Sequence, residues 1–409
     1  MPAPALVLPP VAAAVVAALA FVGMRLRPAK VQAEAGVPIL DLSDLGNSKQ
    51  MLHAATHLGV FRLRGHRLGG PAVLNASRTF FAQPEAIKRS ARSASGASGG
   101  FERGYIPLAG ESGLRQFVEL KEGFCYGREG EGRGGVSAGQ PADEPEEPTC
   151  ESLLIRPNAW PVAEPDATSS AVGGAWRAVM LGFLEECIAL TDTIGESLST
   201  ALGAAPSMIG DLAKGGEDIS LMRLFHYFSP GVAPELAPGV PRTGSSPHTD
   251  WHLITIILQD ATGGLQVRRP RPPYDWIDVP AAEGELVIIL GDYASALSGG
   301  RVVSPVHRVL LPSAADGPPR HERFSFTYFR YPRCEAKVPA GSAAAAERKA
   351  RRRARQLKRH KSGVGSEPFN TLVRPEPEGG GLATLATQPF GQLLLDKWRG
   401  VASNKRSDQ

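Results

Sequence analysis

The strongest constraint on the fold is a change in hydrophobic period near residue 220. Residues 171–203 predict one long core-packing helix, because apolar side chains recur at helical spacing: Trp176, Met180, Phe183, Leu184, Cys187, Leu190, Ile194 and Leu198. Strand-like runs with a period of two then follow at 220–227, 252–259, 264–267, 285–290, 306–311 and 324–329. Short strands at this spacing indicate a sandwich or barrel, so we expect a mainly β fold with flanking helices (α+β).

The residues before the long helix predict further elements of a folded region. We expect a short strand within 37–44 that ends in an Asx/Ser turn, a helix around 48–57, a second strand at 59–66 and another helix near 71–89. Residues 127–149 are rich first in Gly and then in Pro and Glu, which predicts a disordered surface insertion.

Composition excludes several classes of protein. The chain has 409 residues, of which 42% are hydrophobic, enough for a sizeable core but not for a polytopic membrane protein. A collagen and a wholly disordered chain are excluded as well. The four cysteines are scattered without a CxxC pair, which argues against a disulfide scaffold or a structural zinc site. A reducing compartment follows, and we expect a cytoplasmic catalytic domain.

Two segments differ from the rest in charge. Residues 5–24 are almost all apolar and precede Arg25, Arg27 and Lys30, which leaves a membrane anchor, a cleaved targeting segment and an Ala-rich tail as alternatives. Residues 347–361 hold nine Lys or Arg and one Glu. That tract is either a surface insertion without specific function or a contact for acidic lipid, nucleic acid or a targeting receptor. Membrane contact through 5–24 or 348–361 therefore stays open.

The residues that indicate chemistry lie in the β-rich half. On an extended segment His248 and Asp250 point to the same face and can reach one ion together. His307 stands within a later strand, and two imidazoles with one carboxylate form the facial triad of non-haem Fe(II) sites. Arg323 and Ser325 also share a face, where they can hold a carboxylate by charge-assisted hydrogen bonds.

His252 offers an alternative metal site. In a regular strand His248, Asp250 and His252 would all face one way and could form a contiguous three-ligand site, for example for zinc. The residues alone leave both sets of three ligands open. Trp251 points to the opposite face and is expected in the core.

In its ordered motifs the chain resembles the isopenicillin-N-synthase-like (plant-type DIOX) branch of the Fe(II)/2-oxoglutarate-dependent dioxygenases. The similarity runs from Val37 to about Ala402. It is carried, in the order of the family, by VPILDLSD (37–44), KEGFCYG (121–127), PNAWP (157–161), MRLFHYF (222–228), HTDWHLITIILQDATGGLQV (248–267), GELVIILGD (284–292), SPVHRV (304–309), RFSF (323–326) and FGQLLLDKWRGV (390–401). The resemblance implies a double-stranded β-helix (jelly-roll) core.

The resemblance also implies roles for single residues. His248, Asp250 and His307 match the iron ligands, so the resemblance favours His307 as the third ligand and places His252 beside the site or in the pocket wall. Arg323 and Ser325 match the residues that bind the distal carboxylate of 2-oxoglutarate. The other matches are Tyr227, which would contact the cosubstrate, and Gly263 and Gly264, which would form a turn requiring positive φ. Two departures are Phe225, where many members have Asn, and the Pro/Gly-rich link at 312–321. The implied cofactors are Fe(II), 2-oxoglutarate and O2, with ascorbate as reductant.

The family pattern divides the chain into segments. These are an N-terminal hydrophobic targeting, anchor or disordered segment (1–36), the non-haem dioxygenase N-terminal region (37–160), the long-helix region (161–219), the jelly-roll domain (220–335), a basic low-complexity insertion (336–368), and a C-terminal helix and tail (369–409).

We expect a monomer that hydroxylates or desaturates a small organic molecule and binds no specific nucleic acid. Two alternatives remain: an oxidase of the same fold that uses no 2-oxoglutarate, and a catalytically silent binding or scaffold protein.

Overall fold

The computed structural model describes residues 36–91, 103–110, 117–129, 154–155, 157–162, 172–229, 231, 239–311, 322–359 and 382–397. The expectations for residues 1–35, for 130–149 of the predicted insertion and for the link at 312–321 lie outside these residues. From Val37 onward the chain forms one compact unit, so the boundaries expected within it separate segments of a single fold.

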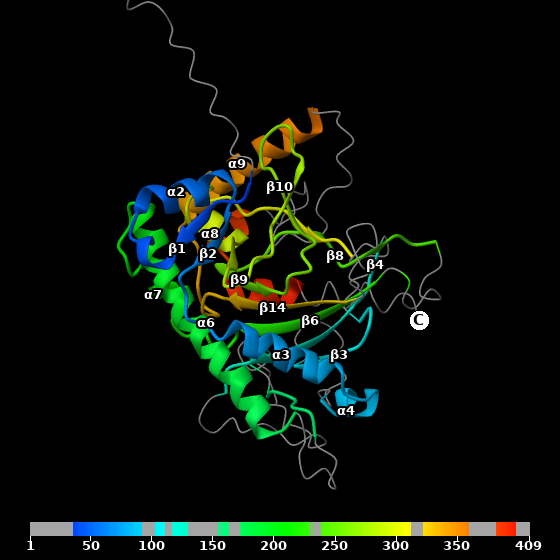
Figure 1. Ribbon diagram of the computed structural model, residues 1–409. Helices are drawn as coiled ribbons and strands as arrows, with labels where there is room; N and C mark the ends of the chain where they lie inside the picture. Colours follow the sequence, from blue (N-terminus) through cyan, green and yellow to red (C-terminus); the bar gives the residue numbers. More distant parts are fainter. Residues whose placement is uncertain are drawn as a thin grey trace, which may run out of the picture. The chain divides into compact units, whose positions relative to one another are not determined.

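Two β-sheets form the centre of the molecule (Figure 1). In hydrogen-bonded order, the large sheet contains β1 (Ile39–Asp41), β2 (Val60–Arg64), β12 (Leu286–Leu290), β9 (Ile254–Gln259), β14 (Glu322–Arg330), β6 (Leu221–Phe228), β5 (Lys121–Gly127) and β3 (Gly104–Ile106). The small sheet contains β11 (Trp276–Asp278), β10 (Leu265–Arg268), β13 (His307–Val309) and β8 (Ser245–His248). The short strands β4 (Val118–Glu119) and β7 (Arg242–Thr243) pair with each other in parallel.

This architecture is the expected jelly roll, an α+β fold in which strands near the start of the chain complete the large sheet. All six predicted strand runs between 220 and 329 are present, as β6, β9, β10, β12, β13 and β14. Of the pairs in the two main sheets, only β1 and β2 run in parallel. The N-terminal region therefore extends the large sheet at both of its edges.

The side chains of each strand point alternately to the two faces of the sheet, and this divides the buried interior into two hydrophobic cores. Successive residues of a strand point to opposite faces of its sheet. On β6, Met222 and Leu224 belong to the core on the helix side, whereas Phe225 and Tyr227 belong to the core that includes Leu265 of the small sheet. Polar residues on this second face of the large sheet consequently point into the space between the sheets.

Helices cover the outer face of the large sheet (Figure 1). The helix predicted for 171–203 is α6 (Gly174–Ala201), which packs on β14, on α2 (Ser48–His57) and on α3 (Gly70–Phe81). The helix predicted for 71–89 is instead two helices, α3 and α4 (Glu85–Ser90), with Pro84 at the N-cap of the second. Proline lacks the amide hydrogen that a continuous helix needs, which explains the break.

The remaining helical segments are shorter or lie at the C-terminal side. They are η1 (Leu42–Asp44), α7 (Met208–Ala213), α8 (Asp292–Leu297), α9 (Ala340–Arg359) and η3 (Leu382–Ala386). Helical backbone also spans residues 390–397, within the segment where a C-terminal helix is expected. In the described part of the chain, no helix combines the length and the apolarity that crossing a membrane requires.

Candidate active site

Two paired strands of the small sheet bring three potential metal ligands together. His248 at the end of β8 lies directly opposite His307 on β13 in the strand register. Asp250 follows two residues later, and its Oδ1 lies 3.8 Å from Nε2 of His248 and 3.7 Å from Nε2 of His307. One ligand atom from each residue lies within 4.8 Å of the other two, the only such group of three among the described residues.

Backbone carbonyl groups set the protonation of both imidazoles. Nδ1 of His248 lies 2.7 Å from the carbonyl oxygen of Ser246, and Nδ1 of His307 lies 3.2 Å from that of Pro305. Because a carbonyl oxygen only accepts hydrogen bonds, each Nδ1 carries the proton and each Nε2 keeps its lone pair toward Asp250. Burial and, to a smaller extent, the neighbouring His248 lower the pKa of His307 to about 4. The ring of His307 is therefore neutral, as metal binding requires.

Asp250 uses its two carboxylate oxygens differently. Oδ2 accepts a hydrogen bond from the Thr255 hydroxyl, while Oδ1 faces the two imidazoles. Burial raises the pKa of Asp250, but nearby His307, His252 and His248 outweigh that effect and hold the pKa below its usual value. The carboxylate is therefore ionised, with one oxygen directed toward the histidines.

His252 does not join this group. Its Nε2 lies 4.0 Å from Oδ2 of Asp250, the oxygen turned away from the two other histidines. The ring packs against Phe329 and Tyr331, at centroid distances of 5.0 and 5.3 Å. The extended strand ends at His248, so the period of two that would align His252 with the cluster does not continue. Trp251 is buried in the core on the helix side, as predicted.

The predicted carboxylate-binding residues lie on the large sheet, on the face that points between the sheets. Arg323 is 1% exposed, and its Nη1 donates a hydrogen bond of 3.2 Å to Oγ of Ser325. Its Nε donates to the carbonyl of Gly263 at 2.6 Å, and its Nη2 donates to Oε1 of Gln259 at 3.1 Å. The guanidinium also lies over the Tyr227 ring, 4.6 Å from the centroid. Within the described residues, every one of these partners is neutral.

The Gly263–Gly264 turn is confirmed as a glycine-dependent conformation. Its φ angles are 79° and 89°, a region that residues with a side chain rarely adopt. A Cβ atom at Gly264 would lie 2.9 Å from the carbonyl oxygen of Leu310, which adds a steric reason. The turn places the carbonyl of Gly263 against Arg323 and so helps to fix the guanidinium.

Phe225, the departure from the family pattern, lies opposite Ser325 in the strand register. Nζ of Lys121 lies 4.6 Å from the centroid of its ring. Lys121 also forms a 2.9 Å salt bridge with Glu119, whose Oε1 accepts a 2.7 Å hydrogen bond from the backbone N–H of Ser246. The buried Lys121–Glu119 ion pair thus connects the Phe225 ring to β8, the strand that carries His248.

Several polar residues that support the site were not identified from the sequence. Thr255 and Gln259 lie on β9 at odd positions, on the same face as Ile257. The sequence does mark these two residues, because Thr255 and Gln259 are the polar residues in the otherwise apolar run ITIILQ. Glu119 gives no comparable signal, because its role depends on a hydrogen bond to a strand distant in sequence.

Comparisons with known proteins agree with this geometry. The model of the 2OG-Fe(II) oxygenase superfamily matches residues 219–332, and that of the non-haem dioxygenase in morphine synthesis N-terminal region matches residues 37–163. A 2-oxoglutarate-dependent dioxygenase of Monascus ruber is 31% identical over 283 residues, which cover 68% of this chain and 75% of the relative. A flavone synthase of Petroselinum crispum is 27% identical over 310 residues, covering 72% of this chain and 71% of the relative.

Solved structures share the fold. A full-length Neurospora crassa protein in complex with alpha-KG has a TM-score of 0.58 at 23% identity, over 76% of this chain and 89% of that one. JOX2 in complex with 2OG, Fe and JA has a TM-score of 0.52 at 25% identity, over 74% of this chain and 76% of that one. With both family regions matched in order and a relative covered over most of its length, the chain belongs to the plant-type DIOX branch of the Fe(II)/2-oxoglutarate oxygenase superfamily and is a 2-oxoglutarate-dependent dioxygenase.

Proposed function

We propose that His248, Asp250 and His307 hold the Fe(II) of this enzyme. The observation that carries the proposal is the convergence of two Nε2 lone pairs and one carboxylate oxygen within 4.8 Å of one another. Two imidazoles and one carboxylate are a donor set suited to Fe(II) that leaves other coordination positions open. The hydrogen bonds from the two Nδ1 atoms and from Thr255 hold all three donors in the required orientation.

Arg323 and Ser325 are proposed to bind the distal carboxylate of 2-oxoglutarate, and Tyr227 is proposed to contact the cosubstrate. A guanidinium that is 1% exposed and has only neutral partners among the described residues is a buried charge that a ligand carboxylate would compensate. Ser325 adds a hydroxyl donor beside it, and Gln259 and Gly263 fix the guanidinium plane. The donor set therefore fits the cosubstrate.

In the reaction, the bound iron and 2-oxoglutarate supply the oxidising chemistry, with release of succinate and CO2. The protein would hold the cosubstrate by its carboxylate at Arg323, while burial keeps the His307 ring neutral and the neighbouring histidines keep Asp250 ionised. Apolar residues of both sheets, including Ile257, Ile289 and Val267, pack in the core between the sheets and exclude water.

The substrate proposed here is a small organic molecule that is hydroxylated or desaturated. The site lies between the two sheets, and the interior wall around Phe225 is largely apolar with one ion pair, Lys121–Glu119. Such a lining suits a small molecule more than an extended polymer. We further propose ascorbate as the reductant, a monomeric enzyme and a cytoplasmic catalytic unit.

Metal content tests the ligand assignment. Replacing His307 or Asp250 by Ala is expected to abolish both stoichiometric Fe(II) binding and succinate formation, because each change removes one of three donors. His252→Ala is the matched control, since it removes a buried imidazole from the far side of Asp250 and should keep the iron. Full iron in His307→Ala together with its loss in His252→Ala would show that the contiguous cluster is the site.

The cosubstrate assignment is tested by titrating 2-oxoglutarate against succinate release. A charge-assisted contact contributes about 1.5–3 kcal/mol, so Arg323→Leu should weaken apparent 2-oxoglutarate affinity about ten- to a hundredfold. Ser325→Ala should cost less, because a neutral hydroxyl contributes about 1 kcal/mol. An unchanged titration with a raised KM for the organic substrate would instead place a substrate carboxylate at Arg323 and favour direct oxidation without 2-oxoglutarate.

A further inference from the structure

The basic tract forms one side of a packed helix. In α9, Ala343 and Ala346 are buried, and the helix contacts α8 and η3. Away from these two residues the helix carries exposed cations: Arg348, Lys349, Arg351, Arg352 and Arg355. Positions 348, 352 and 355 are spaced by four and three residues and therefore lie on one helical face. The tract is thus held against the folded unit with a row of positive charge directed outward.

A hairpin from the small sheet adds to this charge. The β10–β11 connection lies beside α9 (Figure 1), and Arg271 at its tip is exposed. Burial lowers the pKa of Arg353 on α9, and the proximity of Arg271 lowers it further. Arg271 and Arg353 therefore repel each other, so the hairpin adds positive charge beside the basic tract.

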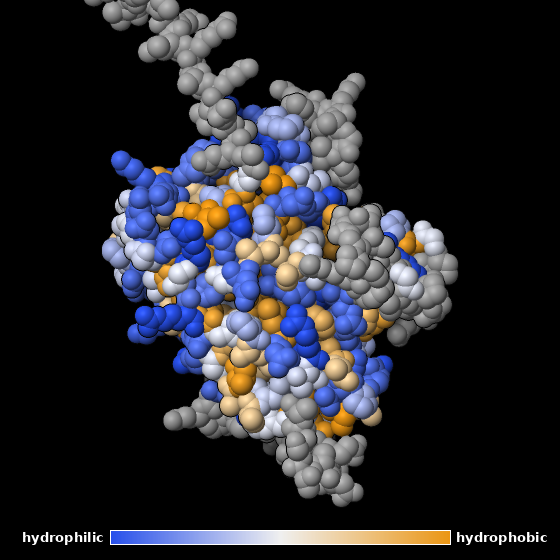
Figure 2. Space-filling model, in the orientation of Figure 1, coloured by the Kyte–Doolittle hydropathy of each residue, from blue (hydrophilic) through white to orange (hydrophobic). Residues whose placement is uncertain are grey.

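Acidic residues neutralise little of this surface. Among the described residues, the salt bridges here join Arg269 to Asp275 at 3.0 Å and Arg351 to Glu347 at 2.6 Å. Glu347 also accepts a hydrogen bond from the backbone N–H of Leu382, so it is directed toward the protein. Figure 2 shows hydrophilic side chains at the upper end of the region where Figure 1 shows α9, with hydrophobic side chains below them.

We propose that the outward face of α9, together with Arg271, is a docking surface for an anionic lipid bilayer. A row of Arg and Lys on a helix is attracted to acidic headgroups within about a Debye length of the membrane. The helix Ala340–Arg359 contains no aromatic residue, so it lacks the stacking platforms of single-strand nucleic-acid binders.

The N-terminal sequence supports a membrane rather than a nucleic acid as the partner. Residues 11–23 form an uninterrupted apolar run, and Arg25, Arg27 and Lys30 follow it. Stable attachment to a bilayer takes two signals, such as an apolar anchor together with a polybasic patch. The chain carries both kinds of signal, whereas an apolar run has no use in binding a polyanionic duplex.

Vesicle sedimentation of the full-length protein tests this inference. We expect binding to phosphatidylcholine vesicles that contain phosphatidylserine to exceed binding to pure phosphatidylcholine, and the difference to disappear at about 0.5 M salt. The variant Arg348→Gln/Arg352→Gln/Arg355→Gln keeps helix-forming residues. It should weaken the phosphatidylserine-dependent binding about a hundredfold, at about fivefold per basic residue.

The control variant removes three exposed cations elsewhere on the surface: Lys49→Gln/Arg67→Gln/Lys214→Gln. It has the same net charge as the α9 variant and should bind vesicles like the wild type. Both variants should keep succinate release, which separates this test from that of the active site. Equal losses in both variants, or no loss in the α9 variant, would refute the docking surface. Binding of a DNA duplex without vesicle binding would assign the face to nucleic acid instead.

Discussion

Asp250 shows how single residues determine the geometry of the metal site. Its Oδ1 faces the imidazoles of His248 and His307, while its Oδ2 accepts a hydrogen bond from the Thr255 hydroxyl. A carboxylate with one oxygen hydrogen-bonded is restricted in rotation and offers the other oxygen to the metal. In the proposed iron site, Thr255 would thereby contribute to iron affinity without being a ligand.

We therefore expect Thr255→Val to weaken Fe(II) binding about 10- to 100-fold, the usual cost of losing a partner of a ligand. Competition with a chelator of known affinity measures this change. Thr191→Val is the control, because that buried hydroxyl bonds only to the carbonyl of Ile188 within α6, at 2.8 Å. Equal losses in the two variants would mean that the effect is one of general stability.

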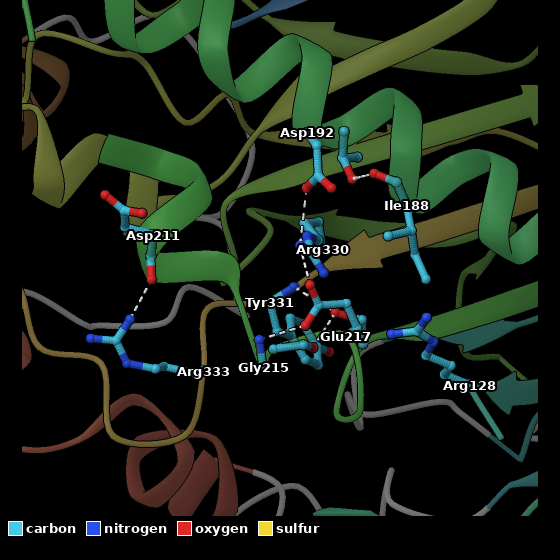
Figure 3. Close-up of polar contacts among 12 residues, drawn as sticks. Arg128, Ile188, Asp192, Asp211, Gly215, Glu217, Arg330, Tyr331 and Arg333 are labelled. Carbon is cyan, nitrogen blue, oxygen red and sulfur yellow. Dashed lines mark hydrogen bonds and ion pairs between the residues drawn. The ribbon is translucent and has the colours of Figure 1, made fainter. Parts of the chain in front are cut away.

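At the scale of elements, β14 connects the cosubstrate end of the site to the helical layer. Arg323 and Ser325 lie near its start, and Arg330 ends it. Arg330 is 2% exposed and forms salt bridges with Asp192 of α6 at 3.0 Å and with Glu217 at 2.8 Å (Figure 3). One end of the strand is therefore fixed by charge, and the other presents Arg323 and Ser325, the proposed carboxylate-binding residues.

Arg330→Met should lower the free energy of unfolding by about 3 kcal/mol, because it leaves the largely buried Glu217 carboxylate without its cation. Asp192 is 50% exposed in the same network, so Asp192→Asn should cost less than about 1 kcal/mol. Urea unfolding of the two variants measures the difference. Similar midpoints would show that Glu217 finds another partner or is solvated.

For the whole molecule, buried histidines make stability depend on pH. Burial lowers the pKa of His252 to about 4, and burial lowers that of His307 to about 4 as well. The unfolded chain therefore binds more protons than the folded one between pH 6.5 and about 4. The stability that the two neutral rings contribute is present above pH 6.5 and is lost as the pH falls toward 4. Asp250, with a pKa lowered from 3.8, titrates below this window.

The unfolding temperature of the metal-free protein should thus fall between pH 6.5 and about 4, and His252→Gln should reduce this dependence by about half. Differential scanning calorimetry across this range measures both. Because Nε2 of His307 is protonated in the same range, bound iron should also be released there. A His252→Gln protein with the wild-type pH dependence would show that His252 does not titrate in this range.

The sequence by itself determined the fold class and, through its resemblance to a known family, indicated the type of chemistry. The change of hydrophobic period near residue 220 was sufficient to predict a helical layer and a set of short strands, since burial of one face imposes that period. Short spacings also identified the pairs His248–Asp250 and Arg323–Ser325, because both members lie on one local segment of backbone.

Only the tertiary structure decided which distant groups meet. The register of β8 with β13 places His307 against His248, and the end of the strand after His248 keeps His252 away from the cluster. The link between Glu119 and Ser246 and the approach of Arg353 to Arg271 likewise depend on chain packing. Periodicity reports which face of an element is buried, but the contacts between elements arise from the free energy of the whole packed chain.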